Sequence, residues 1–426
     1  MRLTLPLALL ATLPLLQACG GSLDDGAQLR LVNATNNHAS LDLYRDDERV
    51  IAGIVPATVS GWASLAEGSA TLALTSGDAG STLVSLTADL VRGEHHAVLA
   101  YVTGGNLKAA LLDEDADAPA AGQARLRVLN AAPSELASLD VYLTSKACSA
   151  LDDSDVPAFP AVTGVDGNAF ASFAAGSRRV CVTGAGDPAD LRHEVPALAL
   201  ADGQVATLVL TRSAGGVLLD GALLNQQGVL TPLANPYARV RLAADASGGA
   251  TVGASVNGIT LATATRSPAV GAYRLVPSGD LAVTLAIAGT SQAVSGLAAA
   301  SGTDQTLLVT GSAASPGAVL LNDLNLPSTS SSKPARIRLV HGLNGSAAAL
   351  AMTVDGEIVA DGVGFASASA PANVATAAAT ATLELSLAGS VLQTLADQTL
   401  ADGRVYSLFV LGDAGGTVST ILRADR

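Results

Sequence analysis

The sequence predicts an all-β protein of four tandem antiparallel β-sandwich domains behind a cleavable apolar leader. Three observations predict it: short alternating strands between Gly, Asp and Asn turns, a fourfold strand pattern, and an apolar run that ends at a cysteine. The chain has 426 residues, which suits two to four domains at roughly 100–200 residues each. Because 49% of the residues are hydrophobic and 14% are charged, it can bury several cores.

The first eighteen residues are interpreted as a signal peptide. Arg2 follows the amino terminus, and the apolar run 3–16 contains prolines and is too short to remain as a membrane span. The sequence Leu16-Gln17-Ala18-Cys19 resembles the lipobox of bacterial lipoproteins. This resemblance implies cleavage before Cys19 and lipid attachment to its thiol, which anchors the chain stably in a membrane. Gly20, where an Asp would resemble an inner-membrane retention signal, favours the outer membrane.

An apolar-Arg-apolar strand recurs four times and defines the repeats. Its arginines are Arg30, Arg127, Arg241 and Arg338, at spacings of 97, 114 and 97 residues. These spacings suit small domains and not solenoid units. Side chains alternate along a strand, so the aliphatic neighbours face the core and each arginine faces outward. We interpret the arginines as parts of solvated strand faces.

Further strands keep register with the first one. Second strands are expected at Leu41–Tyr44, Leu139–Tyr142, Val252–Val256 and Met352–Val354. Late strands follow turn glycines at Gly93–Tyr101, Gly203–Thr211, Gly302–Thr310 and Gly403–Leu411, and each is followed by a glycine hairpin and a closing strand. Many short strands without a long helical period predict antiparallel sandwiches.

Shifts in composition give the expected boundaries. They are a signal peptide at 1–18, a lipidated tether at 19–27, sandwiches at 28–112, 123–225, 237–326 and 335–426, and linkers at 113–122, 226–236 and 327–334. The third linker is rich in Ser and bracketed by prolines. We therefore expect the fourth domain to swing relative to the first three.

The recurring landmarks resemble DUF4397, a domain of unknown function found in tandem in secreted and anchored bacterial proteins. The second copy carries the resemblance in Val128–Pro133 and in Leu139-Asp140-Val141-Tyr142, and the fourth in His341 and Gly403–Ser407. The third copy lacks both the Pro and the Asp-x-Tyr. The resemblance implies an immunoglobulin-like fold and supplies no activity.

Cys148 and Cys181 are the cysteines left once Cys19 carries lipid. An even pair in an oxidising envelope compartment predicts a disulfide, the alternative being two unpaired buried thiols.

No constellation in the sequence predicts catalysis, a cofactor or a metal. The Gly-x-Ser-x-Gly elbow is absent, and the five histidines lack ligand spacing. The acidic turn Asp152–Asp155 is a weak calcium candidate, better interpreted as solvated. Exposed aromatic residues would indicate sugar binding, but aromatic residues are scarce and Trp62 is the single Trp. Tyr44 and Tyr142 occupy equivalent strand positions and are interpreted as core or sheet-edge residues. The net charge of −14 argues against nucleic acid as a partner.

We therefore expect a non-catalytic, lipid-anchored cell-envelope protein of the outer membrane, either periplasmic or surface-facing. It would act as a multi-domain scaffold or an interaction and adhesion module. Its partners would be membrane lipid, through Cys19, and a protein or glycan. The alternatives are a carbohydrate-binding envelope module and, less favoured, an envelope hydrolase with a site between domains.

Overall fold

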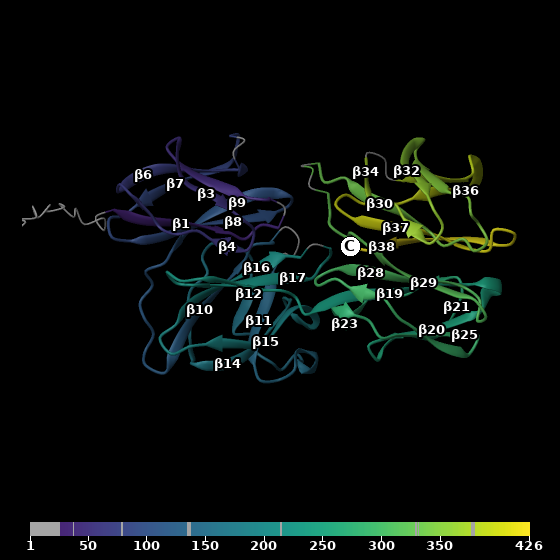
Figure 1. The fold of residues 1–426 in the computed structure, drawn as a ribbon, viewed down its shortest axis with the longest axis horizontal. Coiled ribbons are helices and arrows are strands. Elements are labelled where there is room, and N and C mark those ends of the chain that lie inside the picture. Colours follow the sequence, from purple (N-terminus) through teal and green to yellow (C-terminus); the bar gives the residue numbers. More distant parts are fainter. Residues whose placement is uncertain are drawn as a thin grey trace, which may run out of the picture.

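The computed structural model describes residues 26–36, 38–77, 80–133, 138–213, 215–328, 330, 332–375 and 380–426 (Figure 1). The predicted all-β class is confirmed. Within these ranges the helical segments are 3-10 turns such as η2 (Cys148–Ala150) and η3 (Ser247–Gly249). No helix in the described part of the chain is long and apolar enough to cross a bilayer. The signal peptide, Cys19 and nearly all of the tether lie outside the described residues.

Sandwich 1 consists of two sheets. One has the strand order β4-β1-β8-β9, with β5 also pairing with β1, and the other has the order β3-β2-β6-β7. Its strands are β1 (Ala27–Asn33), β2 (Leu41–Arg45), β3 (Glu48–Ile54), β4 (Thr58–Val59), β5 (Ala63–Leu65), β6 (Gly68–Thr75), β7 (Thr82–Leu90), β8 (His95–Thr103) and β9 (Asn106–Asp113).

Sandwich 2 pairs β13-β10-β16-β17-β18 with β12-β11-β14-β15. Its strands are β10 (Gln123–Asn130), β11 (Leu139–Thr144), β12 (Phe159–Val162), β13 (Ala171–Ala174), β14 (Gly176–Gly184), β15 (Asp187–Leu200), β16 (Val205–Arg212), β17 (Leu219–Asn225) and β18 (Leu230–Leu233).

Sandwich 3 consists of two main sheets. One has the strand order β22-β19-β28-β29, with β23 also pairing with β19, and the other has the order β21-β20-β25-β26. A separate two-stranded sheet pairs β24 with β27. Its strands are β19 (Tyr237–Ala246), β20 (Thr251–Val256), β21 (Ile259–Arg266), β22 (Ala269–Val270), β23 (Arg274–Pro277), β24 (Gly279–Asp280), β25 (Val283–Ile287), β26 (Thr290–Val294), β27 (Ala298–Ala299), β28 (Asp304–Gly311) and β29 (Pro316–Asn322).

Sandwich 4 consists of two sheets. One has the strand order β33-β30-β37-β38, with β34 also pairing with β30, and the other has the order β32-β31-β35-β36. Its strands are β30 (Ala335–His341), β31 (Leu350–Val354), β32 (Glu357–Val363), β33 (Ser367–Ala368), β34 (Ala372–Val374), β35 (Ala381–Leu387), β36 (Ser390–Gln398), β37 (Val405–Gly412) and β38 (Val418–Ala424).

Each sandwich contains one parallel strand pair, which the expectation of purely antiparallel sheets missed. These pairs are β1 with β8, β10 with β16, β19 with β28, and β30 with β37. Between the two strands of each pair the chain forms the opposite sheet and then returns. The returning strand therefore enters beside the first one in the same direction, as a crossover connection allows.

The interior of each sandwich is filled by small aliphatic side chains, as the low aromatic content predicts. In sandwich 1, Leu29 and Leu31 of β1 face Leu41, Leu43 and Leu72 of the opposite sheet, and all five are fully buried. Burying one such side chain contributes about 1.5–3 kcal/mol. Alternation along β1 therefore orients the strand and sends Arg30 to the other face.

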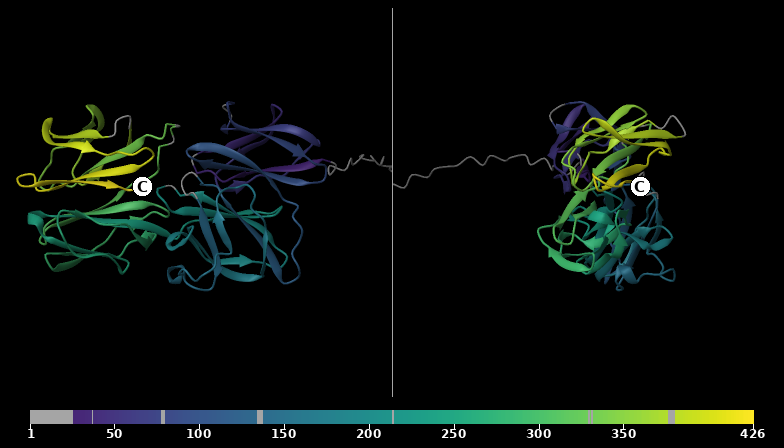
Figure 2. Two further views of the ribbon diagram at one scale, coloured as in Figure 1. Left: turned by 180° about the vertical axis from the view of Figure 1, so that it is seen from behind. Right: turned by 90° about the vertical axis from the view of Figure 1, so that its right-hand side faces the viewer.

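Sandwiches 1 and 2 pack against each other, and so do sandwiches 3 and 4, through the outer faces of the sheets that hold the parallel pairs (Figures 1 and 2). The first interface buries Val32, Ala97, Leu99, Leu112, Leu129, Ala131, Val165, Val209 and Leu224. The second buries Ala243, Val270, Leu308, Val340, Phe409 and Leu411. The expectation that the fourth domain swings is wrong, because this apolar face holds it on sandwich 3.

The two packed pairs are a structural repeat. Arg241 follows Arg30 by 211 residues, and Arg338 follows Arg127 by the same 211. The same sheet faces form both apolar interfaces. The repeating unit of the architecture is therefore two sandwiches packed face to face, whereas the sequence pattern suggested single beads.

Cys148 and Cys181 form a disulfide, with an S–S distance of 1.99 Å and a sequence separation of 33 residues. The bridge joins η2 to β14 and packs with Tyr142. We predict that the double variant Cys148→Ala and Cys181→Ala lowers the free energy of unfolding by about 3 kcal/mol, because the unfolded chain regains the entropy of an open loop. Urea unfolding followed by circular dichroism measures this. Reductant should weaken the natural chain and leave the variant unchanged; equal stability of the two chains would contradict the prediction.

Candidate functional site: a buried polar network between the sandwiches

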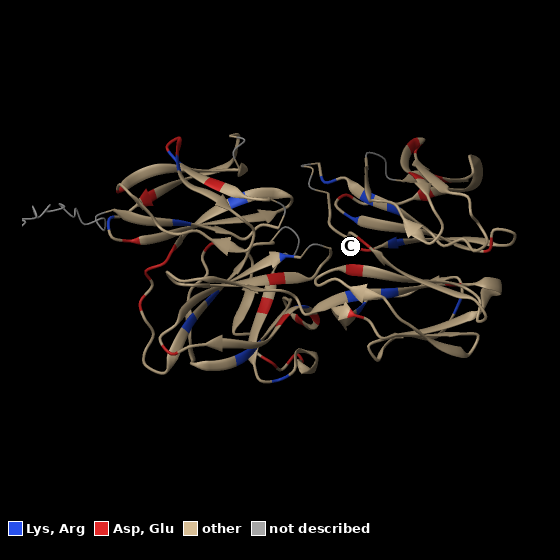
Figure 3. Ribbon diagram, in the orientation of Figure 1, with Lys and Arg blue, Asp and Glu red and all other residues tan. Residues whose placement is uncertain are grey.

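The four repeated arginines lie in the interfaces between sandwiches. Arg30, Arg241 and Arg338 are only 1–2% exposed, and Arg127 is half-buried. The interpretation of these residues as a solvated strand face was therefore wrong. Alternation does direct each arginine away from its own core, but the neighbouring sandwich covers that face. Figure 3 shows basic residues on the strands that line the plane between sandwiches 3 and 4.

Three of the four arginines are oriented by the strand that runs parallel to their own. Arg127, Arg241 and Arg338 pair in register with Thr207, Thr306 and Ser407. In all three, the guanidinium Nε donates to the hydroxyl of the paired residue, at 2.8, 2.9 and 2.7 Å. In the first copy the paired residue is Ala97, and Arg30 Nε donates to Glu114 Oε1 at 2.6 Å instead.

The acceptors for the remaining guanidinium nitrogens come directly after the closing strand of each sandwich. The residue at this position is Glu114, Gln226, Asp323 or Asp425. Glu114 pairs with Arg30, Asp323 pairs with both Arg241 and Arg338, and Asp425 pairs with Arg241. Where the position is Gln226, Arg127 donates instead to the carbonyl of Asp113 at 3.2 Å and lies 4.5 Å from the centre of the Phe170 ring.

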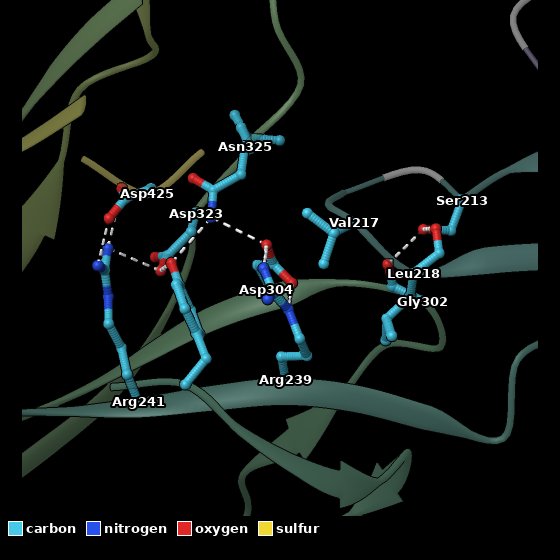
Figure 4. Close-up of polar contacts among 12 residues, drawn as sticks. Ser213, Val217, Leu218, Arg239, Arg241, Gly302, Asp304, Asp323, Asn325 and Asp425 are labelled. Atoms are coloured by element: carbon cyan, nitrogen blue, oxygen red, sulfur yellow. Dashed lines mark hydrogen bonds and ion pairs between the residues drawn. The ribbon is translucent and has the colours of Figure 1, made fainter. Parts of the chain in front are cut away.

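The pairing between sandwiches 3 and 4 is reciprocal. Arg338 Nη2 of sandwich 4 lies 2.5 Å from Asp323 Oδ1, and Arg241 of sandwich 3 forms an ion pair with Asp425 at the carboxyl end of the chain. Arg241 also lies 3.0 Å from Asp323, so one carboxylate serves two guanidinium groups (Figure 4). Burial alone would raise the pKa of Asp323, but Arg338 and Arg241 hold that pKa below its ordinary value.

Tyr273 extends this network toward β28. The Arg241 guanidinium lies 4.5 Å from the centre of the Tyr273 ring and 5.0 Å from that of Phe409, within the range of cation–π attraction. The Tyr273 hydroxyl donates to Asp323, and burial raises its pKa, so it stays a donor. Asn325 Nδ2 lies 2.9 Å from both the Tyr273 hydroxyl and Asp304 Oδ2.

Sandwiches 2 and 3 meet through a separate set of contacts. Ser213 Oγ lies 2.6 Å from the carbonyl of Gly302 (Figure 4). The Tyr237 hydroxyl donates to Glu194 at 2.6 Å. A Cβ at position 216 would come within 2.4–2.5 Å of the Asp304 carboxylate, so glycine is required there for the close approach. These bonds join the two packed pairs to each other.

The network binds and orients whole domains. Its carboxylates are already neutralised by arginines, and its hydroxyls already have acceptors. A buried charge that has a partner is costly to separate from it, so each of these contacts resists opening of the interface.

Residues 27–142 match the family model DUF4397, a domain of unknown function. The chain is a DUF4397-containing protein. The match covers all of sandwich 1, runs through β10 of sandwich 2 and ends within β11. No curated protein matches the chain.

Solved structures similar to this chain share little sequence with it. A candidate cell adhesion protein from Bacteroides uniformis is 13% identical, with a TM-score of 0.21 over 48% of this chain and 99% of that one. A streptococcal family 41 carbohydrate-binding module is 12% identical, with a TM-score of 0.16 over 43% and 93%. A family 26 module from Eubacterium rectale is 11% identical, with a TM-score of 0.16 over 46% and 95%. Such low TM-scores support no functional argument.

The remaining candidate residues lie apart from one another in the structure. Cys19 lies outside the described residues. His95 Nδ1 lies 3.0 Å from Asp115, whereas His193 is fully buried in sandwich 2, where burial lowers its pKa to about 4. In the described ranges, no three His, Cys, Asp or Glu side chains form a group that could hold a metal ion.

The acidic turn and the single Trp are held by their neighbours. Asp155 accepts from Lys146 Nζ at 2.6 Å. The Asp152 carboxylate caps the amide of Ser154 at 2.9 Å. Trp62 is 36% exposed, and the Arg30 guanidinium lies 4.7 Å from its ring centre. Trp62 therefore borders the polar network. A sequence signal for the network did exist, since a polar residue follows every closing strand.

Asp245 gives the interface of sandwiches 3 and 4 a pH dependence. Its carboxylate is 1% exposed and accepts from the Gly412 amide at 2.7 Å and from Asn344 Nδ2 at 3.0 Å. Burial raises its pKa from 3.8 to about 7; the Gly412 amide opposes this rise and Asp413 adds to it. Between these values the folded chain binds more protons than the unfolded chain, so the contribution of Asp245 to stability falls as pH rises from about 4 to 7.

We predict that Asp245→Asn removes this part of the pH dependence. Urea unfolding at pH 5 and at pH 8 measures it, with Asp280→Asn in the exposed short strand β24 as the matched control. The difference in unfolding free energy between the two pH values should change in the first variant and stay unchanged in the second. Identical pH profiles for Asp245→Asn and the natural chain would show that Asp245 does not titrate in this window.

Proposed function

We propose that this chain is a non-catalytic, lipid-anchored protein of the outer cell envelope, and that it works as a rigid spacer that presents an interaction surface. The observation that carries the proposal is the buried ion-pair network that fixes sandwich 4 on sandwich 3. The charged groups of this network pair with one another across the domain interface and so hold the domains together; they are Asp323, Asp425, Arg241 and Arg338. A scaffold needs a constant shape, which this network provides.

The wider arrangement supports the same role. The two packed pairs are joined by Ser213 to Gly302 and by Tyr237 to Glu194. The pair of sandwiches 1 and 2 therefore lies beside the pair of sandwiches 3 and 4, and the four sandwiches form one block (Figure 1). A tether at Cys19 would attach that block to lipid beside sandwich 1, with sandwiches 3 and 4 directed away from the anchor.

Small-angle scattering of a fragment spanning residues 20–426 tests the rigid shape. We expect one scattering profile that matches the four-sandwich arrangement and does not change between low and moderate salt. A distribution of maximum dimensions reaching that of a fully extended string would contradict the rigid spacer.

Expression in a bacterial host tests the anchor. The natural chain should incorporate labelled palmitate and sediment with outer membranes, and Cys19→Ala should do neither. Ser22→Ala is the matched control and should behave like the natural chain. Unlabelled natural chain in the soluble fraction would overturn the lipid anchor.

Two assays distinguish the alternative functions, an envelope hydrolase and a carbohydrate-binding module, from a scaffold. Labelling by a serine-hydrolase activity probe would favour an enzyme. Retention on a glycan array, lost in Trp62→Ala, would favour a carbohydrate-binding module. A scaffold gives neither result.

A further inference from the structure

A pocket of about 410 Å³ lies where sandwiches 1, 2 and 3 meet. Its wall is mostly small and apolar, including Ala34 and Pro56 of sandwich 1 and Ala222 and Pro232 of sandwich 2. Ser301 of sandwich 3 completes the rim. Volumes of this size, at a domain interface and with few polar groups, are typical of small-molecule sites.

One carboxylate on this wall, Asp220 on β17, lacks a cationic partner among the described residues. It accepts one hydrogen bond, from the Asn235 amide at 2.9 Å, and forms no ion pair there. Burial raises its pKa, and the Asn235 amide opposes this rise. Two carboxylates buried near the same junction do have arginine partners, Glu114 with Arg30 and Asp304 with Arg239. Asp220 is therefore the unmatched charge of the junction.

The position of Asp220 directs its carboxylate toward the pocket. Thr211 and Asp220 are register partners on β16 and β17, and Val209 pairs with Ala222 one step along the same face. Val209 belongs to the apolar interface with sandwich 1, so this face points toward sandwich 1. Gly221, between Asp220 and Ala222, faces the core and lies against His193, where a Cβ would come within 3.1 Å of the ring. The carboxylate thus stands beside an apolar wall and beneath the Ala34 segment.

We propose that this pocket binds a small organic cation, a primary ammonium on a short aliphatic body, with Asp220 as its counter-ion. The ammonium group donates to the free carboxylate oxygen, and the aliphatic body replaces water on Ala34, Pro56, Ala222 and Pro232. Arg212 also lines the pocket, and it would favour the opposite ligand charge. Because the ligand contacts three sandwiches, binding stabilises the junction as well as the pocket.

The probes are n-hexylammonium, n-hexanol and n-hexanoate, titrated into the fragment 20–426 and followed by calorimetry and by the melting temperature. We expect hexylammonium to bind at least tenfold more tightly than hexanol and to raise the melting temperature, with no measurable binding of hexanoate. Asp220→Asn keeps the acceptor for Asn235 and removes the charge, so it should weaken hexylammonium at least tenfold and leave hexanol unchanged.

Two further variants keep the test decisive. Asp187→Asn changes an exposed aspartate at the start of β15 in the same sandwich, and hexylammonium should bind it as it binds the natural chain. Ser301→Trp narrows the rim and should weaken all binding while the protein stays folded by circular dichroism. The proposal is overturned if hexanoate binds best, if no probe binds, or if Asp220→Asn and Asp187→Asn bind hexylammonium equally.

Discussion

Replacing Asp323 with alanine is expected to lower the free energy of unfolding by about 3–5 kcal/mol, the cost of breaking a buried ion pair. The Asp323 carboxylate is fully buried and lies between Arg338 and Arg241, at 2.5 and 3.0 Å. Thr306 and Tyr273 also donate to it. Its removal takes away the carboxylate that pairs with the buried Arg338 guanidinium and leaves Arg241 paired with Asp425. The Tyr273 hydroxyl also loses its acceptor.

Urea unfolding followed by circular dichroism measures this loss. The matched control is Glu67→Ala, which breaks an exposed pair with Arg92 of 3.2 Å and should change stability by at most about 0.5 kcal/mol. A second variant, Gln226→Ala, tests the neutral position equivalent to Asp323 and should cost much less than Asp323→Ala, since no ion pair is broken. Equal effects of Asp323→Ala and Glu67→Ala would mean that the interface carries no buried charge.

The sequence predicted the strands well because each sandwich buries one face and turns at glycines. Leu29 and Leu31 alternate with Arg30, so the strand, its core face and the outward direction of the arginine could all be deduced. The parallel pair could not be deduced from alternation, which is the same in both directions. It follows from where the chain returns after the second sheet, and that is a property of the whole fold.

The packing of a second sandwich on the outward face of a sheet is visible in the sequence as strands that are apolar on both faces. In β37, Phe409 and Leu411 face outward while Leu408 and Val410 face the core, so the strand is apolar on both sides. Strands buried on both faces read this way. The buried arginines were harder to predict, because one polar residue in an apolar strand resembles a solvated position until its partner is known. In three of the four copies the acidic residue after the closing strand is that partner, 84 residues from Arg30 and 82 from Arg241.

The ligand pocket beside Asp220 and the pH response of Asp245 could not be predicted from the sequence at all. Each depends on segments of different sandwiches that meet only in the folded chain. The equivalents of Asp245 in the other copies are Ala34, Ala131 and Gly342, four residues after each repeated arginine. Its carboxylate is thus a departure from the repeat, and a repeat pattern does not tell whether such a departure is exposed or buried.

Cutting the chain between sandwiches 3 and 4 is expected to leave one particle. A protease site placed within residues 328–332 would separate Asp323 from Arg338 along the chain and leave their contact intact. The apolar cluster around Phe409 and Leu308 and the pair of Arg241 with Asp425 also cross the cut. After cleavage, size exclusion with light scattering should still give the mass of the whole chain, even at 0.5 M salt, since screening acts weakly on buried pairs.

The comparison that decides this result is the same cut made in a chain whose interface has been damaged. Val340 points into the apolar cluster, and Val340→Asp places an unpaired charge there. That cleaved chain should release the carboxyl-terminal fragment, while uncut Val340→Asp keeps the intact mass. Ile358→Asp, on an exposed strand of the same sandwich, should leave the cleaved particle together. Release of the fragment from the natural chain would restore the string of independent domains and remove the main support for a rigid spacer.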